Sequence, residues 1–221
     1  MCNRYRMAKD SFTIIVHGRE FQIAFGARYN ITPTQKVPIL IPDPVEDFKF
    51  VEMTWGLQVP WQSGPVLNAK AETLTQRNTF KSIIQNRCLI PADGFYEFTG
   101  PEGNKQPILF TKKHDAAFCI AGLYQTIITQ PEDVEIKTQN FVLITTTPNK
   151  SVGKYHDRMP LIVHEQHYGW WLTGSELYNT ALENPDKEEL YTLPVTKELN
   201  KTKNNEGPHL NRPAPIQREL L

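Results

Sequence analysis

The hydrophobic residues of this chain fall mostly in short runs that are separated by polar or proline-containing segments. Runs rich in Val, Ile, Phe and Thr are typical of β-strands, and they occupy residues 12–16, 37–41, 48–53, 108–111, 117–128 and 141–146. Between two apolar runs, residues 99–105 read Thr-Gly-Pro-Glu-Gly-Asn-Lys, which predicts the turn of a β-hairpin. The pattern therefore predicts a core built mainly from strands.

Helical periodicity is confined to a few segments. Phe80, Ile83 and Ile84 have the i, i+3, i+4 spacing of a short amphipathic helix within residues 79–87. A second helical region is predicted, with Ser175 as an N-cap, at residues 165–172 and 175–183. Proline-containing segments predict surface loops at residues 42–44 and 184–186.

These elements predict one α+β domain over residues 1–221, with a β-rich core of barrel-like antiparallel sheets and a few flanking short helices. The 17 prolines disfavour a helical bundle. A chain of 221 residues can bury a sizeable core. The stretch from about residue 200 to 221 is polar and proline-rich, so we expect it to be ordered only where it packs on the body.

Composition excludes several classes of protein. No apolar run approaches the roughly 18 residues of a membrane helix, and the N-terminus lacks the apolar stretch of a signal peptide, so we expect a cytoplasmic protein. Three cysteines at positions 2, 88 and 119 make no disulfide framework. With 24 Lys+Arg against 24 Asp+Glu, the chain cannot grip nucleic acid by bulk charge, and any such binding requires a local basic patch.

Cys2 is the first candidate for chemistry because of its position. Removal of Met1 would leave Cys2 with a free α-amine beside its thiol, and such an amine has a pKa of about 7.7–8.0. The amine can attack an aldehyde to give an imine, and the thiol can then close a five-membered thiazolidine ring. An internal cysteine cannot do this, because its nitrogen is an amide. The alternative is an inert small residue, since the reactivity of a cysteine depends on its surroundings.

Two further segments place polar side chains among aromatic ones. In residues 67–73, Asn68 could hold a hydroxyl or carbonyl and Lys70 could meet a phosphate, unless the segment is a capped helix start with solvated charges. Glu97 stands among Phe95, Tyr96 and Phe98. Burial there would raise its pKa and suit it to proton transfer, whereas a water-facing Glu97 would be inert.

The segment 156–160 gathers His156, Asp157 and Arg158 ahead of an apolar run. Histidine moves protons near neutral pH, and arginine can clamp a phosphate. The alternative is a structural loop in which Asp157 and Arg158 pair with the scaffold.

Metal and nucleotide motifs give no comparable signal. His164 and His167 have ligand-like spacing but lack a matching partner segment, so we expect no metal site. The sequence contains no P-loop, no dinucleotide fingerprint and no Gly-x-Ser-x-Gly elbow. We therefore expect no cofactor.

Eight motifs in order along the chain resemble the SOS-response-associated peptidase (SRAP) family. They are MCNRY (1–5), ARYNITPTQ (27–35), WGL (55–57) with PW (60–61), NAKAET (68–73), RCLIPADGFYEF (87–98), AGLY (121–124), TTTPN (145–149) and HDRMP (156–160). The resemblance spans nearly the whole chain, to about Val195. Eight ordered motifs are far more specific than any one of them.

The resemblance implies a sensor of abasic sites in single-stranded DNA that forms a covalent thiazolidine crosslink through the processed N-terminal cysteine. Carried over to this chain, Cys2 would be the nucleophile and Asn68 would hold the opened sugar. Glu97 would move protons during ring opening and thiazolidine formation, and His156 would assist at the Schiff-base stage. A weak abasic-site lyase activity and an autopeptidase activity that removes Met1 are also implied.

The resemblance also implies DNA contacts from basic, aromatic and neighbouring side chains around this pocket, namely Arg4, Pro33, Trp55, Trp61, Lys70, Arg77, Thr146 and Arg158. Two positions depart from the family pattern. The family usually has Arg at the position of Lys70, and a lysine in its place cannot bind a phosphate in the bidentate way of an arginine. The family usually has Trp at the position of Phe98, and the smaller ring of phenylalanine leaves this chain a smaller stacking surface.

Two other functions remain open. A cysteine-type peptidase or thiol hydrolase would use Cys2 as acyl nucleophile, with His156 or Glu97 as the base. A non-catalytic module would bind single-stranded DNA through Trp55, Trp61 and the basic residues. The expected partner is single-stranded DNA that contains abasic sites, and we expect a monomer that does not associate with membranes.

Overall fold

The computed structural model describes residues 2–131, 135–174, 178–183, 185–202 and 207–214. Its strands are β1 (Tyr5–Met7), β2 (Ser11–Val16), β3 (Arg19–Ala24), β4 (Arg28–Ile31), β5 (Lys36–Asp43), β6 (Asp47–Trp55), β7 (Asn68–Lys70), β8 (Arg87–Ala92), β9 (Gly94–Thr99), β10 (Gln106–Thr111), β11 (Phe118–Thr129), β12 (Ile136–Thr146), β13 (Met159–Pro160), β14 (Ile162–Val163) and β15 (Tyr191–Pro194). The described α-helices are short: α1 (Asn78–Lys81), α2 (Tyr168–Thr173) and α3 (Tyr178–Glu183). This confirms the predicted α+β class with a β-rich core.

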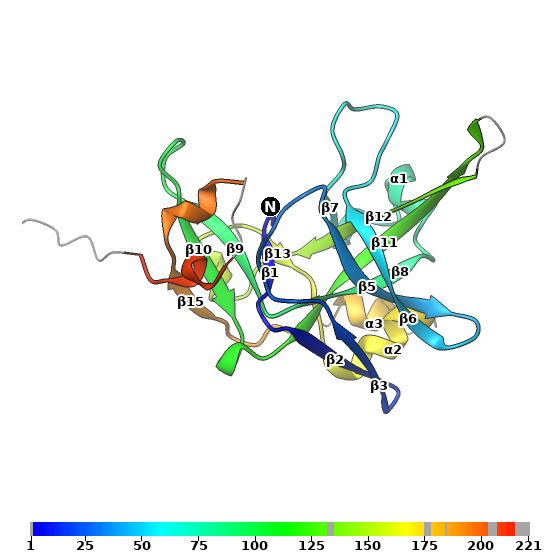
Figure 1. The fold of residues 1–221 in the computed structure, drawn as a ribbon, viewed down its shortest axis with the longest axis horizontal. Helices are drawn as coiled ribbons and strands as arrows, with labels where there is room; N and C mark the ends of the chain where they lie inside the picture. The colour runs from blue at the N-terminus through cyan, green and yellow to red at the C-terminus, as the bar shows by residue number, and fades with distance from the viewer. Residues whose placement is uncertain (1, 132–134, 175–177, 184, 203–206, 215–221) are drawn as a thin grey trace, which may run out of the picture.

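The larger sheet closes on itself as a barrel, seen on the right of Figure 1. Its closed path runs β12-β6-β5-β8-β11 and returns to β12 through the β11–β12 pairing. The expectation of antiparallel sheets holds for most pairs, but β12 runs parallel to β6 and to β7. Short β7 therefore lies on β12 at the barrel rim, where its polar residues are held by backbone hydrogen bonds.

A second sheet has the order β15-β10-β9-β1-β4 and lies beside the barrel in Figure 1. The chain passes from barrel strand β8 into β9 with only Asp93 between them. Strand β1 pairs antiparallel with β9, with Tyr5 opposite Phe95. The β9–β10 pairing confirms the hairpin predicted at residues 99–105. This sheet thus places the N-terminal segment beside β9, a strand near the middle of the sequence.

Helices α2 and α3 lie below the barrel in Figure 1, where α2 contacts β8 and β5, whereas α1 lies on the upper side of the barrel in this view. Trp171 of α2 is fully buried and donates a hydrogen bond from Nε1 to the Cys88 carbonyl at 2.9 Å. The predicted helical region at 165–172 is present as a 3-10 turn (Glu165–His167) followed by α2, and the predicted helix at 79–87 is present as α1 with turns after it. Ser175, the predicted N-cap, lies outside the described residues.

The surface loop predicted at residues 42–44 begins later in the structure. Pro42 and Asp43 belong to the end of β5, so the turn begins at Pro44.

Part of the C-terminal stretch packs on the body, as expected. A 3-10 turn (Pro208–Asn211) lies on the second sheet, where Leu210 is buried and Tyr96 donates a hydrogen bond to Asn211 Oδ1 at 2.7 Å. Among the described helices, none is long and apolar enough to cross a membrane.

Trp55 lies in the core, where strand β6 ends. Its side chain is fully buried, its ring meets Tyr5 edge to face and stacks on Phe141, and its Nε1 donates to the Leu67 carbonyl at 3.0 Å. The expectation that Trp55 contacts DNA is therefore not met, because its ring has no exposed face to offer a base. Trp55 is instead part of the packing between β1, β6 and β12.

Replacing Trp55 and Trp61 one at a time distinguishes a buried tryptophan from an exposed one. Trp55→Ala is expected to lower the free energy of unfolding by about 3–5 kcal/mol, because it leaves a cavity in the core and an unpaired carbonyl. Trp61→Ala, at a position 63% exposed, is expected to change it by less than about 0.5 kcal/mol. Urea denaturation of both variants measures the difference, and equal losses would contradict this placement of the two rings.

Candidate functional site

The candidate site lies where the second sheet meets the rim of the barrel. A pocket of about 500 Å³ opens there, which we call the Glu97 pocket; it is lined by Asn3, Arg4, Glu97, Phe98, Glu102, Gly103, Lys105, His156 and Asn200. Its walls come from the N-terminal segment, strand β9, the β9–β10 turn and the loop before β13. A hydrogen bond from Asn200 Nδ2 to the Lys105 carbonyl, at 2.9 Å, closes one side of its rim.

Cys2 is fully buried immediately before the two pocket residues Asn3 and Arg4. Its thiol donates a weak hydrogen bond to the Arg4 carbonyl, with Sγ and O 3.5 Å apart. Burial raises the pKa of this thiol well above its usual range, and the negative charge of Glu97 raises it further. The thiol is therefore protonated at neutral pH, and any reaction at sulfur needs a nearby group to take its proton.

Glu97 is the group suited to that task. It sits on β9 with only 3% of its surface exposed, so the alternative of a water-facing Glu97 is wrong. Burial raises the pKa of the carboxyl to about 7, and the charge of Asp157 acts in the same direction. At neutral pH both protonation states are populated, as proton transfer in either direction requires.

His156 faces Glu97, with Nε2 3.8 Å from Glu97 Oε2. The backbone N–H of Arg158 donates to His156 Nδ1 at 3.0 Å. A neutral imidazole that accepts at Nδ1 carries its proton on Nε2, the nitrogen that faces Glu97. Asp157 Oδ1 also lies 3.0 Å from Nδ1, but Nδ1 cannot donate to it in this tautomer. Burial lowers the pKa of His156, which favours this neutral form.

Asn68 approaches from the barrel side, on β7. The parallel pairing of β7 with β12 puts Asn68 opposite Leu143 and fixes its backbone. Its Nδ2 donates to Asn3 Oδ1 at 3.3 Å. Its Oδ1 is buried with no hydrogen-bond partner among the described residues, so it remains an acceptor for a ligand hydroxyl. The alternative of a capped helix start at residues 67–73 is wrong, since the segment is a strand followed by a 3-10 turn (Ala71–Thr73).

On the other side of the Asn3–Asn68 hydrogen bond lies a second hollow of about 640 Å³, which we call the Lys70 pocket. It is lined by Trp61, Asn68, Lys70, Thr73, Gln76, Arg77, Asn78, Thr79 and Phe80. Trp61, Lys70 and Arg77 are exposed, so one aromatic face and two cations border this pocket. Three of the expected DNA contacts are therefore gathered beside Asn68.

The remaining expected DNA contacts are placed differently. Arg4 lines the Glu97 pocket, but its Nη1 donates to Asn30 Oδ1 and to the Leu199 carbonyl, both at 2.9 Å, and its guanidinium lies over the Phe98 ring. Pro33 is half-buried after β4 and lines neither pocket. Thr146 is buried and lines a separate hollow of about 400 Å³. The structure does not bring Pro33 and Thr146 to the two pockets.

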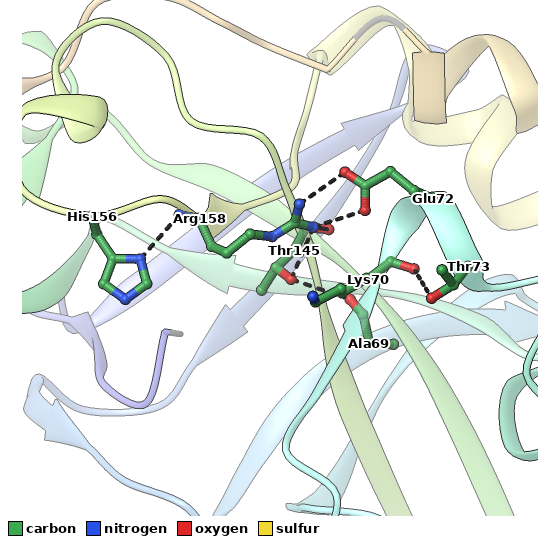
Figure 2. A network of polar contacts seen from close by, with 7 residues as sticks. All are labelled: Ala69, Lys70, Glu72, Thr73, Thr145, His156 and Arg158. Carbon is green, nitrogen blue, oxygen red and sulfur yellow. Dashed lines mark hydrogen bonds and ion pairs between the residues drawn. The ribbon is translucent and has the colours of Figure 1, made fainter.

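Arg158 is held by its neighbours in the fold. Nη1 and Nη2 each donate to one carboxylate oxygen of Glu72 at 2.9 Å, and Nη2 also donates to the Thr145 carbonyl at 2.6 Å (Figure 2). This matches the alternative in which Arg158 pairs with the scaffold. Asp157 does not match this alternative, because its side chain is mostly exposed and lies beside His156.

Sequence reasoning gave no role to several residues that shape the site, among them Asn3, Glu72, Lys105 and Asn200. Asn3 could have been suspected from its place next to Cys2, and Glu72 from its place in the motif that contains Asn68. Lys105 and Asn200 carry no such signal, because only the fold brings their segments together. Among the described residues, no group of three or more His, Cys, Asp or Glu side chains is placed to hold a metal ion.

Together these contacts place a buried carboxylate and an imidazole in one pocket next to the segment that carries Cys2, beside a second pocket that two cations border. A family model described as SOS response associated peptidase (SRAP) matches residues 1–202. The chain therefore belongs to the SRAP family.

Named relatives and solved structures agree with this assignment. The chain is similar to the abasic site processing protein YoqW of Bacillus subtilis, with 30% identity covering 93% of this chain and 96% of the relative. Its identity to YoaM of the same organism is 32%, covering 80% and 81%. A crystal structure of a Bacteroides thetaiotaomicron protein superposes with a TM-score of 0.69 at 25% identity, covering 85% of this chain and 86% of that one.

The raised pKa of Glu97 makes stability depend on pH. The folded chain keeps a proton that the unfolded chain releases between its ordinary pKa of 4.5 and about 7, so the free energy of unfolding falls as pH rises through that interval. Glu97→Gln removes this loss. The variant is expected to exceed the original chain by on the order of 3 kcal/mol at pH 8 and to match it at pH 4.

Denaturation of both proteins at the two pH values measures this difference. Glu20→Gln, an exposed change on β3, serves as the control and is expected to show no such dependence. A Glu97→Gln effect of the same size at pH 4 and pH 8 would contradict the raised pKa.

Proposed function

We propose that this protein captures abasic sites in single-stranded DNA covalently, through a Cys2 whose α-amine has been freed by removal of Met1. The observation that carries the proposal is the buried Glu97, with a pKa of about 7, beside the Cys2 thiol and His156. The relatives whose printed names describe abasic site processing support the choice of substrate.

The chemistry follows from the groups present. An abasic sugar opens from its ring form to an aldehyde. The Cys2 amine adds to the aldehyde carbon, and loss of water gives an imine. The thiol then adds across the imine: a carbon–sulfur bond forms, the thiol proton leaves sulfur, and a proton arrives on nitrogen. The product is a thiazolidine, and no redox partner is needed.

Each neighbouring residue has a task in these steps. Protonated Glu97 donates a proton to the oxygen that leaves as water, and its carboxylate form accepts the proton that the high-pKa thiol must give up. His156 directs its Nε2–H toward the Glu97 carboxyl group, where it can act as a donor whether Glu97 is protonated or ionised. The unpartnered Asn68 Oδ1 accepts a hydrogen bond from a hydroxyl of the opened sugar.

The DNA strand would pass along the Lys70 pocket into the Glu97 pocket. Lys70 and Arg77 provide positive charge for phosphates, and exposed Trp61 provides a face on which an unpaired base can stack. Such a local basic patch is what DNA binding requires of a chain whose net charge is zero.

Two further activities belong to the same proposal. The imine can drive weak lyase cleavage by β-elimination, and autopeptidase action on Met1 would expose the amine.

The central test is crosslinking. Purified protein with Met1 removed, mixed with a single-stranded oligonucleotide that contains one abasic site, is expected to give a heat-stable conjugate on a denaturing gel. Its mass is expected to equal the sum of the two reactants less one water. Cys2→Ala is expected to abolish the conjugate, while Cys119→Ala, at another buried cysteine, is expected to keep it.

Three results would refute the proposal: equal crosslinking by the original chain and Cys2→Ala, no crosslinking by either, or equal crosslinking when Met1 is retained. A peptidase would instead be acylated at Cys2 by activated esters and would be inert to aldehydes, which intact mass reveals. A plain binding module would bind reversibly, and its binding would survive replacement of Cys2.

The rate of crosslinking is expected to be bell-shaped in pH. It rises as the Cys2 amine, with an ordinary pKa of about 7.7–8.0, loses its proton, and it falls as Glu97 loses the proton that it donates near pH 7. Glu97→Gln is expected to slow the reaction by about 100-fold and to remove the falling limb, leaving a rise to a plateau. Single-turnover rates at a series of pH values measure this, and a falling limb retained in Glu97→Gln would rule out the assigned role.

A further inference from the structure

The turn between β9 and β10, at residues 100–105, borders the Glu97 pocket and is held in place by the segment that follows β15 (Figure 1). Lys197 Nζ donates a hydrogen bond to Asn104 Oδ1 at 2.6 Å. Asn200 Nδ2 donates to the Lys105 carbonyl at 2.9 Å. Because two neighbouring residues of the turn are anchored in this way, the turn forms a defined rim of the pocket.

Lys105 brings a positive charge to this rim. Its side chain is exposed, and it makes no hydrogen bond or ion pair with another residue in the part of the chain that the structure describes. Burial is the main cause of the lowered pKa of His156, and the positive charge of Lys105 acts in the same direction. The ammonium group therefore lies close enough to the site for its charge to act on the imidazole.

The other charges that line the Glu97 pocket do not favour a phosphate at this rim. Glu102, the second exposed charged residue of the lining, is acidic. Arg4 is basic, but it is buried and its Nη1 donates to two acceptors within the fold. An exposed carboxylate repels a phosphate, so a DNA strand that crosses this rim needs the charge of Lys105 beside it.

The two pockets lie on either side of the Asn3–Asn68 hydrogen bond, and this arrangement defines a path for the strand. A sugar within a strand is joined to one phosphate on each side. Under the proposed function, the strand passes Lys70 and Arg77 on one side of the abasic sugar. It therefore has to leave the Glu97 pocket on the other side, where the β9–β10 turn forms the rim.

We propose that Lys105 binds the backbone phosphate on the side of the abasic sugar that faces away from the Lys70 pocket. This proposal rests on the proposed function for the path of the strand. A lysine suits the position, because a compact ammonium group on a flexible stem can neutralise a phosphate without a fixed bidentate geometry. Cations would then hold the strand on both sides of the lesion.

The test measures reversible binding to a single strand that contains tetrahydrofuran, a ring-closed abasic analogue without an aldehyde, so that no crosslink forms. Lys105→Gln is expected to weaken binding about three- to tenfold at low salt and to reduce the slope of log K against log salt by about 0.7, as for one phosphate contact on a single strand. Lys105→Arg keeps the charge and is expected to bind within about twofold of the original chain. Fluorescence anisotropy at a series of salt concentrations measures these values.

Lys113→Gln is the matched control, because it removes the same charge from another exposed turn. Lys113 lines a hollow of about 520 Å³ together with Leu109, which pairs with Tyr96, so this hollow lies on the face of the second sheet opposite Glu97. The control is expected to keep the original affinity and slope. Equal losses in Lys113→Gln and Lys105→Gln, or no loss in Lys105→Gln, would overturn the proposal.

A second measurement identifies the phosphate. In two further strands, a neutral methylphosphonate replaces the phosphate on one side or the other of the tetrahydrofuran, and both replacements are expected to weaken binding by the original chain. Lys105→Gln is expected to lose its sensitivity to one replacement, and Lys70→Gln its sensitivity to the other. Undiminished sensitivity of Lys105→Gln to both, or loss of the same one by both variants, would contradict the assignment.

These binding measurements are independent of the crosslinking reaction. If the original chain binds the analogue as expected but does not crosslink a true abasic strand, the proposed function fails and the phosphate contact stands. If the original chain crosslinks but Lys105→Gln binds the analogue with the original affinity and slope, the phosphate contact fails and the proposed function stands.

Discussion

The pairing of β1 with β9 is the constraint on which the rest of the site depends. It brings the start of the chain against a strand more than eighty residues further along, with Tyr5 opposite Phe95. Cys2 is thereby buried within the electrostatic influence of Glu97, and burial shifts the pKa of both groups upward. A thiol that holds its proton and a carboxylate that exchanges one near neutral pH are consequences of the same packing.

The second contribution comes from the rim of the barrel. Parallel pairing with β12 holds a three-residue strand, β7, whose polar side chains would not form a strand alone. Asn68 and the Glu72–Arg158 pair are therefore placed by β12, while Glu97 is placed by β9. The site is assembled where two separate sheets meet, and small displacements of one sheet against the other would change its geometry.

Much of the fold could be predicted, because runs such as 48–53 and 141–146 are regular strands with an apolar pattern of their own. Barrel closure through a parallel β12–β6 contact could not, since periodicity says nothing about strand partners. The ordered motifs identified Cys2, Asn68, Glu97 and His156 as candidates, and the fold brings their segments together. Motifs could not separate Trp55 from Trp61, because exposure depends on distant residues such as Phe141.

The complete burial of Cys2 has a consequence for the order of events during synthesis. Strand β1 leaves the ribosome long before β9, its partner in the sheet, has been made. During that interval the N-terminal segment has no strand to pair with and is accessible to processing enzymes. Under the proposed function, a separate processing enzyme can free the Cys2 amine in that interval, whereas autopeptidase action requires the site that the docking of β1 completes.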